Sequence, residues 1–102
     1  MNKPLVRNAS DEGQIKDAKI KVQLSREQEV NDLKFILATE QGRRFLWRTL
    51  EMCGVYRSSF TASSETYFLE GQRNIGLKLL SEITDIDPDS YLKMIKENKG
   101  VQ

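Results

Sequence analysis

The chain has 102 residues, and 16 Lys and Arg stand against 15 Asp and Glu, so its formal net charge is +1. This length predicts one small domain with a thin core. The lack of histidine excludes a Ser-His-Asp or Cys-His nucleophile and a histidine-bearing zinc site. The single cysteine, Cys53, excludes an internal disulfide and a CxxC metal motif. No catalytic residue, metal or cofactor is therefore expected. No stretch approaches the roughly 18 apolar residues of a membrane span, so no membrane partner is expected either.

The first part of the chain, residues 1–24, is polar and carries scattered charges of both signs. Its apolar residues are too sparse to form a core, which predicts a flexible N-terminal arm that precedes a single helical domain over 25–100. Ile20, Val22 and Leu24 alternate as they would in a strand. We therefore expect the arm to become ordered only against a partner.

Two helices are predicted in the first half of the domain. Ser25 and Gln28 have the spacing of a capping box, and the apolar residues that follow predict a helix over about 26–38. Thr39 is expected to cap a second helix over about 40–53, with Gly54 as its stop. Trp47 is predicted to lie off the inner face of that helix. The residues expected on the inner face are Phe45, Leu46, Thr49, Leu50 and Cys53.

Two further helices are predicted after a loop over 55–64, from which Tyr56 and Phe60 are expected to enter the core. Asp87 followed by Pro88 predicts the start of a fourth helix, over about 88–98. The third helix, over about 64–83, is expected to bury one stripe of residues, Phe68, Gly71, Ile75, Leu79 and Ile83, and the fourth Tyr91, Leu92 and Ile95. The predicted fold class is therefore all-α, a compact bundle of about four short helices.

Two patterns resemble ligand sites but lack essential residues. Asp85, Asp87 and Asp89 have the spacing of the first ligands of a calcium loop, but Ser90 and Lys96 stand where that loop needs glycine and glutamate. The acidic residues are therefore expected to cap a helix. The two glycines of Gly71-Gln-Arg-Asn-Ile-Gly76 have phosphate-loop spacing but lie within a helical period, which predicts close packing of a neighbouring helix.

A basic cluster is predicted around Trp47, formed by Arg43, Arg44, Arg48 and Arg57. Such a cluster suits phosphate contacts with an aromatic side chain for stacking, so a small nucleic-acid-binding module is one interpretation. The alternative is ion pairing or a protein interface, because glutamates lie nearby in the sequence and the net charge is close to zero. The second interpretation is favoured.

Ten positions between residues 42 and 76 occur in a characteristic order. They are Gly42, Arg43, Arg44, Cys53, Gly54, Phe60, Glu70, Gly71, Arg73 and Gly76. This pattern resembles a family of small tailed-phage proteins named after a gene product of a Bordetella podophage and encoded among head and packaging genes. Gln72 departs from the pattern, which often has arginine there, and the residues before 25 match nothing in it.

The resemblance implies a non-enzymatic phage protein, either a structural component of the virion or an accessory of head assembly. Its expected partners are other phage proteins, in the virion or in the host cytoplasm during assembly. Self-association is a further expectation, which follows from the thin core of so short a chain. Glu70 is expected to pair with Arg43, Arg44 or Arg73. The candidate interaction residues are Arg43, Arg44, Trp47, Arg48, Arg57 and Arg73. The candidate structural residues are Gly42, Cys53, Gly54, Phe60, Glu70, Gly71 and Gly76.

Overall fold

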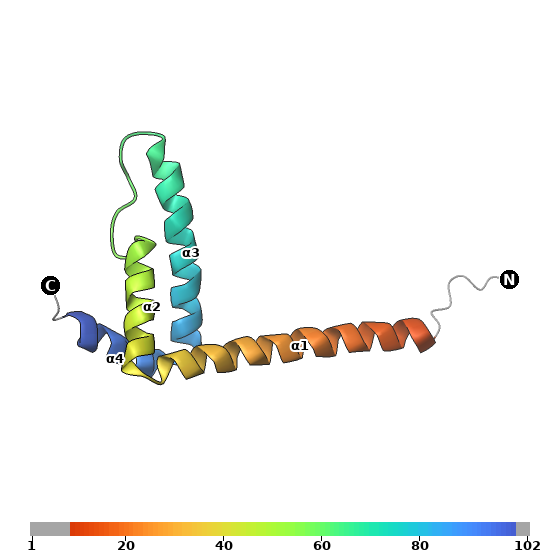
Figure 1. Ribbon diagram of the computed structural model, residues 1–102. Helices are drawn as coiled ribbons and strands as arrows, with labels where there is room; N and C mark the ends of the chain where they lie inside the picture. Colours follow the sequence, from red (N-terminus) through yellow and green to blue (C-terminus); the bar gives the residue numbers. More distant parts are fainter. Residues whose placement is uncertain (1–8, 100–102) are drawn as a thin grey trace. The chain divides into compact units, whose positions relative to one another are not determined.

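The computed structural model describes residues 9–99, which form four helices and no strand (Figure 1). The predicted all-α class with four helices is confirmed. The helices are α1 (Ala9–Leu37), α2 (Glu40–Met52), α3 (Glu65–Ile86) and α4 (Pro88–Lys99). The chain divides into two compact units between Asp32 and Leu33. None of the helices described over 9–99 is long and apolar enough to cross a membrane.

The first unit consists of the N-terminal part of α1, and here the structure differs from the sequence prediction. The helix begins at Ala9 rather than near residue 26, so Ile20, Val22 and Leu24 are helical and not strand-like. The reason is local: no proline follows Pro4 in this stretch, and most of its residues favour helix. Side-chain contacts one turn apart continue past the predicted boundary, with Gln23 donating to Glu27 at 3.5 Å and Arg26 to Glu29 at 3.3 Å. Residues 1–8 of the predicted arm lie outside the described residues.

The second unit, from Leu33 onward, is built on α2 and α3, which pack side by side and run in opposite directions (Figure 1). The connection between them, residues 53–64, lies at the opposite end of this pair from α4, which packs on both helices. The core is small. Its buried apolar residues are Leu33, Leu37, Leu46, Leu50, Val55, Ile83 and Met94.

The predicted starts and stops of these helices are confirmed where they depend on a local cap. The Thr39 hydroxyl accepts a hydrogen bond from the Gly42 N–H at 3.0 Å at the start of α2. Gly54 follows α2 with φ +78°, a conformation that favours glycine. The Asp87 carboxylate accepts hydrogen bonds from the Ser90 N–H at 3.1 Å and from the Ser90 hydroxyl at 2.6 Å at the start of α4.

Several apolar residues predicted to be buried are exposed. The stripe predicted for α3 is buried only towards the end of the helix, where Ile83 is fully buried and Leu79 packs against the core. In the first half of α3 its members Phe68 and Ile75 are exposed, and Gly76 is buried instead, because apolar residues occur on two sides of this half and periodicity fits both. In α4 the fully buried residue is Met94. The predicted core residues that are in fact exposed are Phe45, Tyr56, Phe60, Phe68, Ile75 and Leu92.

The two glycines of α3 also differ in whether they contact the rest of the second unit. A Cβ at Gly76 would lie 2.5 Å from Val55 Cγ2 and 2.6 Å from Cys53 Cβ, so the predicted close contact is present there. A Cβ at Gly71 would meet nothing within 4 Å. The prediction of a helix contact at Gly71 is therefore wrong within the described chain, because Gly71 belongs to the exposed stripe of α3.

Candidate protein-binding surface

Arg43 is a buried residue that joins three helices of the second unit. Its Nε and Nη2 donate to the two carboxylate oxygens of Glu97 in α4, at 2.8 and 2.7 Å, and its Nη1 donates to the Leu37 carbonyl of α1 at 2.9 Å. The hydrogen bonds from Arg43 lower the pKa of Glu97, and those to Glu97 raise the pKa of Arg43. The predicted role of Arg43 in binding a partner is wrong, because its side chain is only 9% exposed.

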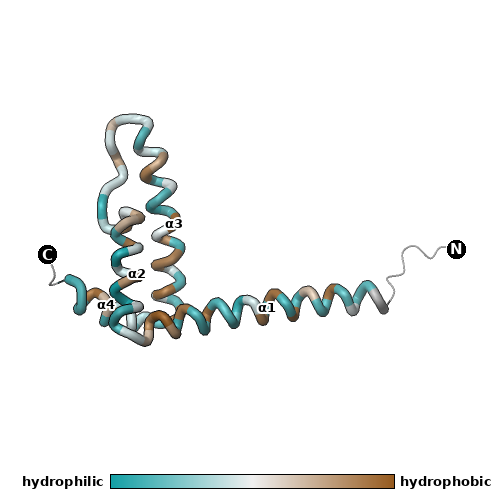
Figure 2. The backbone as a smooth tube through the Cα atoms, viewed as in Figure 1, coloured by the Kyte–Doolittle hydropathy of each residue, from teal (hydrophilic) through white to brown (hydrophobic). Residues whose placement is uncertain are grey.

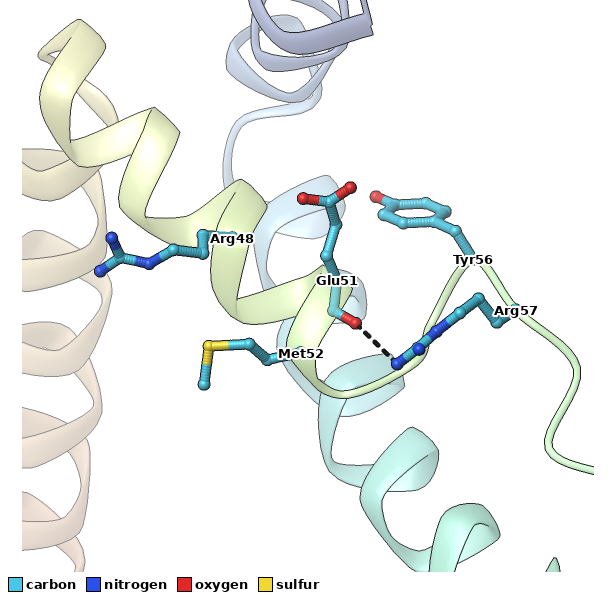
Figure 3. Close-up of a pocket in the computed structure, with 5 residues that line it drawn as sticks. All are labelled: Arg48, Glu51, Met52, Tyr56 and Arg57. Atoms are coloured by element: carbon cyan, nitrogen blue, oxygen red, sulfur yellow. Dashed lines mark hydrogen bonds between the residues drawn. The ribbon is translucent and has the colours of Figure 1, made fainter. Parts of the chain in front are cut away.

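The other arginines of the predicted basic cluster do not converge on one point. Arg44 is 3.8 Å from Glu40 one turn earlier, and the Arg48 guanidinium lies 5.4 Å from the centre of the Phe45 ring. Arg57 donates to the Glu51 carbonyl at 3.2 Å near the end of α2. Figure 3 shows that Arg48 extends away from the other side chains of the hollow it shares with Arg57. This hollow has about 450 Å³ and is lined by Arg48, Glu51, Met52, Tyr56 and Arg57.

Trp47 packs against the core, although its spacing predicted a position off the inner face. Its ring stacks on Tyr56 with 5.0 Å between ring centres. The Tyr56 hydroxyl is hydrogen-bonded to that of Tyr91 in α4 at 2.8 Å, and burial together with this bond raises the pKa of Tyr56. The three aromatic residues therefore fasten the end of α2 to α4, which makes Trp47 a structural residue more than a contact surface.

The remaining candidate residues lie near the middle of α3 and the end of α2. Cys53 is half-buried and packs against the core, as predicted. Glu70 forms none of the expected ion pairs with Arg43, Arg44 or Arg73 within residues 9–99. Arg73 is half-buried, and its Nε is buried without a hydrogen-bond partner in the same range. No group of three or more metal-ligating residues occurs in the described part of the chain.

The connection before α3 is held in one shape by hydroxyl groups. Thr66 Oγ1 accepts from the Thr61 N–H and also contacts Thr61 Oγ1, both at 2.9 Å, and Thr61 Oγ1 lies 3.0 Å from Ser63 Oγ. Ala62 has φ 62°, which a residue with a Cβ rarely adopts. Backbone conformations of this kind occur often in functional segments. A hollow of about 440 Å³ here is lined by Phe60, Ala62, Ser63, Ser64, Thr66 and Tyr67.

Next to this connection, large apolar side chains are open to solvent. Phe60 is 73% exposed and Tyr67 82% exposed, and Phe68 and Ile75 of α3 are exposed as well. Figure 2 shows hydrophobic stretches at several levels of α3. This surface was not predicted from the sequence, because the apolar pattern placed three of these four residues in the core and gave no separate signal for Tyr67. Which apolar side of α3 is buried depends on how the neighbouring helices pack against it. The spacing of apolar residues within α3 carries no information on that packing.

The second unit of the chain matches a known protein family. The sequence profile of Bbp19-like phage proteins matches residues 33–96, which is more than half of the chain. The chain therefore belongs to the Bbp19-like phage protein family, in agreement with the resemblance found in its sequence. The match begins at Leu33, where the second compact unit also begins. No curated protein and no solved structure matches the chain.

Proposed function

We propose that this phage protein is not an enzyme and works by binding other phage proteins, as a structural component of the virion or as an accessory of its assembly. Family membership supports a role in a phage, and the type of role is inferred from the surface. In the described chain, more large apolar side chains are exposed than are buried in the core. The exposed ones in the second unit are Phe35, Ile36, Phe45, Met52, Tyr56, Phe60, Tyr67, Phe68, Ile75 and Leu92.

This exposure is the observation that carries the proposal. Scattered exposed apolar residues are normal on a monomer, but a contiguous apolar patch is typical of a protein interface. Phe60 and Tyr67 line one hollow, Phe68 follows Tyr67 directly in α3, and Ile75 lies two turns further along the helix. The N-terminal part of α1 adds Ile20, Val22 and Leu24, which are exposed on a helix that forms a unit by itself.

The arrangement of the arginines gives less support to the alternative of nucleic-acid binding. Phosphate binding needs several cations along one accessible face. Arg43 is bound to Glu97 and Arg44 lies beside Glu40. Arg57 reaches back to the Glu51 carbonyl, whereas Arg48 extends away from the hollow (Figure 3). The nucleic-acid alternative predicts binding that weakens steeply as salt concentration rises. A protein-binding role predicts no such binding by the isolated chain.

Mass spectrometry of purified particles and of their assembly precursors tests the proposed function. The phage that encodes the chain would be grown, and mature particles and precursors would be separated by density before digestion. We expect the chain in at least one fraction, at a constant ratio to the major head protein after further purification. Absence from both mature particles and precursors would contradict the proposal. A host cytoplasmic protein of known abundance serves as the control for contamination.

A further inference from the structure

The surface that runs from residue 58 to residue 77 carries almost no charge. Glu65 is the only charged residue among its exposed side chains, whereas 30% of the whole chain is charged. The exposed members are Ser58, Phe60, Thr61, Ala62, Ser63, Ser64, Glu65, Tyr67, Phe68, Gly71, Gln72, Asn74 and Ile75. Loss of charge together with enrichment in aromatic residues is typical of the centre of a protein interface.

Gly71 lies in the middle of the helical part of this surface. Phe68 precedes it by three residues and Ile75 follows it by four, so all three lie along one side of α3. Both apolar side chains are 66% exposed, and no atom outside the helix backbone lies within 4 Å of a Cβ at Gly71. Glycine inside a helix is unfavourable relative to alanine, and the second unit gains no contact from it. A helix of another chain that crosses here would gain a close approach.

We propose that this side of α3 is a contact between two copies of the chain, in which α3 packs antiparallel on α3 of the second copy and crosses it at Gly71. A two-fold axis at Gly71 brings Phe68 of one copy opposite Ile75 of the other, on the same flank of both helices. Tyr67 and Asn74 meet in the same way on the opposite flank. This contact extends the proposed function, because it names a second copy of the chain as one protein that the surface binds. It rests on the proposed function only for the view that this surface binds a protein.

The charge pattern suits a second copy as the partner. A two-fold contact places each residue near its own equivalents, so a charged surface would bring like charges together. From Tyr67 to Ile75 every exposed residue is uncharged, and the next exposed position along α3 is the charged Lys78. The uncharged stretch is thus centred on Gly71 and ends about one turn beyond Ile75. A nucleic acid or a strongly acidic partner would find no fully exposed cation on this stretch, since its one basic residue, Arg73, is half-buried.

The expected contact is weak, because its apolar area is modest. Three exposed aromatic side chains and Ile75 supply roughly 500 Å², whereas a stable interface buries about 800 Å² per partner. We therefore expect a monomer–dimer equilibrium in the micromolar range. Within an assembly that holds many copies, an interface of this strength would act together with other contacts.

Sedimentation equilibrium of the purified full chain tests the contact. The average mass should rise from monomer towards dimer as concentration increases from the low to the high micromolar range. Phe68→Glu and Ile75→Glu should weaken the association by about tenfold or more. Leu92→Glu, at a 57% exposed position on α4, is the matched control and should associate like the parent. Circular dichroism checks that each variant keeps the helical content of the parent.

Cysteine cross-linking tests the position of the crossing directly. The double variant Phe68→Cys, Ile75→Cys keeps Gly71 at the crossing, and each introduced thiol lies opposite the other substituted position of the second copy, where a disulfide can form. Mild oxidation should then give a covalent dimer, whereas Leu92→Cys and the parent, which holds only Cys53, should give little. A chain that stays monomeric at high concentration would overturn the contact, as would association that Phe68→Glu and Ile75→Glu leave unchanged. A monomeric chain that is nevertheless present in particles would overturn this inference and leave the proposed function standing.

Discussion

Gly42→Ala is expected to destabilise the second unit by about 3 kcal/mol or more. A Cβ at Gly42 would collide with the backbone carbonyl of Ile36, and the Thr39 hydroxyl would lie 3.0 Å away. A backbone group at the end of α1 has little room to move, since only Ala38 and Thr39 join α1 to α2. Denaturant unfolding followed by circular dichroism measures the change.

Gly71→Ala is the matched control for this prediction, because it also places a methyl group on a glycine inside a helix. Nothing lies within 4 Å of its Cβ position, so the higher helix propensity of alanine should stabilise the chain by roughly 0.5–1 kcal/mol in dilute solution. If Gly42→Ala unfolds at the same denaturant concentration as the parent, the two helices do not meet as closely as the structure shows.

Arg43→Met is expected to destabilise the chain by about 2 kcal/mol. Methionine keeps much of the apolar volume but removes two charge-assisted hydrogen bonds to Glu97 and the one to the Leu37 carbonyl. Arg44→Met is the control, because Arg44 is 59% exposed and 3.8 Å from its partner. Its effect should stay below about 0.5 kcal/mol. Equal effects of the two substitutions would contradict the structural role of Arg43.

The same ion pair also predicts how stability changes with pH. The hydrogen bonds from Arg43 hold the pKa of Glu97 below its ordinary value. A carboxyl group whose pKa is lowered in the folded state stabilises the fold above its unfolded value, about 4.3, and this contribution is lost as pH falls through the lowered pKa. Melting curves of the parent should therefore shift downward below about pH 4. Arg43→Met should show a smaller acid-dependent loss, and an unchanged loss would count against the pair as its source.

Features that depend on a few neighbouring residues were predictable from the sequence. Thr39, Gly54 and Asp87 cap or stop helices through atoms within three residues of themselves. The start of α1 was not predicted. Ser25 is a residue type that often caps a helix, so the helix was expected to begin there, although the residues before Ser25 also favour helix. A cap signal inside a stretch of good helix formers does not end that stretch.

Features that depend on contacts between distant residues were not predictable in the same way. Arg43 was identified as important, but its partner Glu97 is 54 positions later, and no local pattern connects the two. Phe68 and Ile75 were assigned to the core because periodicity marks an apolar stripe without saying what covers it. At this level of α3 the structure instead buries the side on which Gly76 meets Cys53 and Val55. The candidate binding surface thus includes apolar residues that were predicted to be buried and are exposed.

Particle yield with variant chains tests most directly whether the exposed apolar surface carries the function. A phage that lacks its own copy would be complemented with the parent chain, with Phe68→Glu, or with Arg48→Gln as a control at another exposed position, on α2. We predict that Phe68→Glu strongly reduces the yield of infectious particles although the variant folds, and that Arg48→Gln supports the yield of the parent. Full yield with Phe68→Glu and a severe loss with Arg48→Gln would contradict the account and favour a surface built on the arginines.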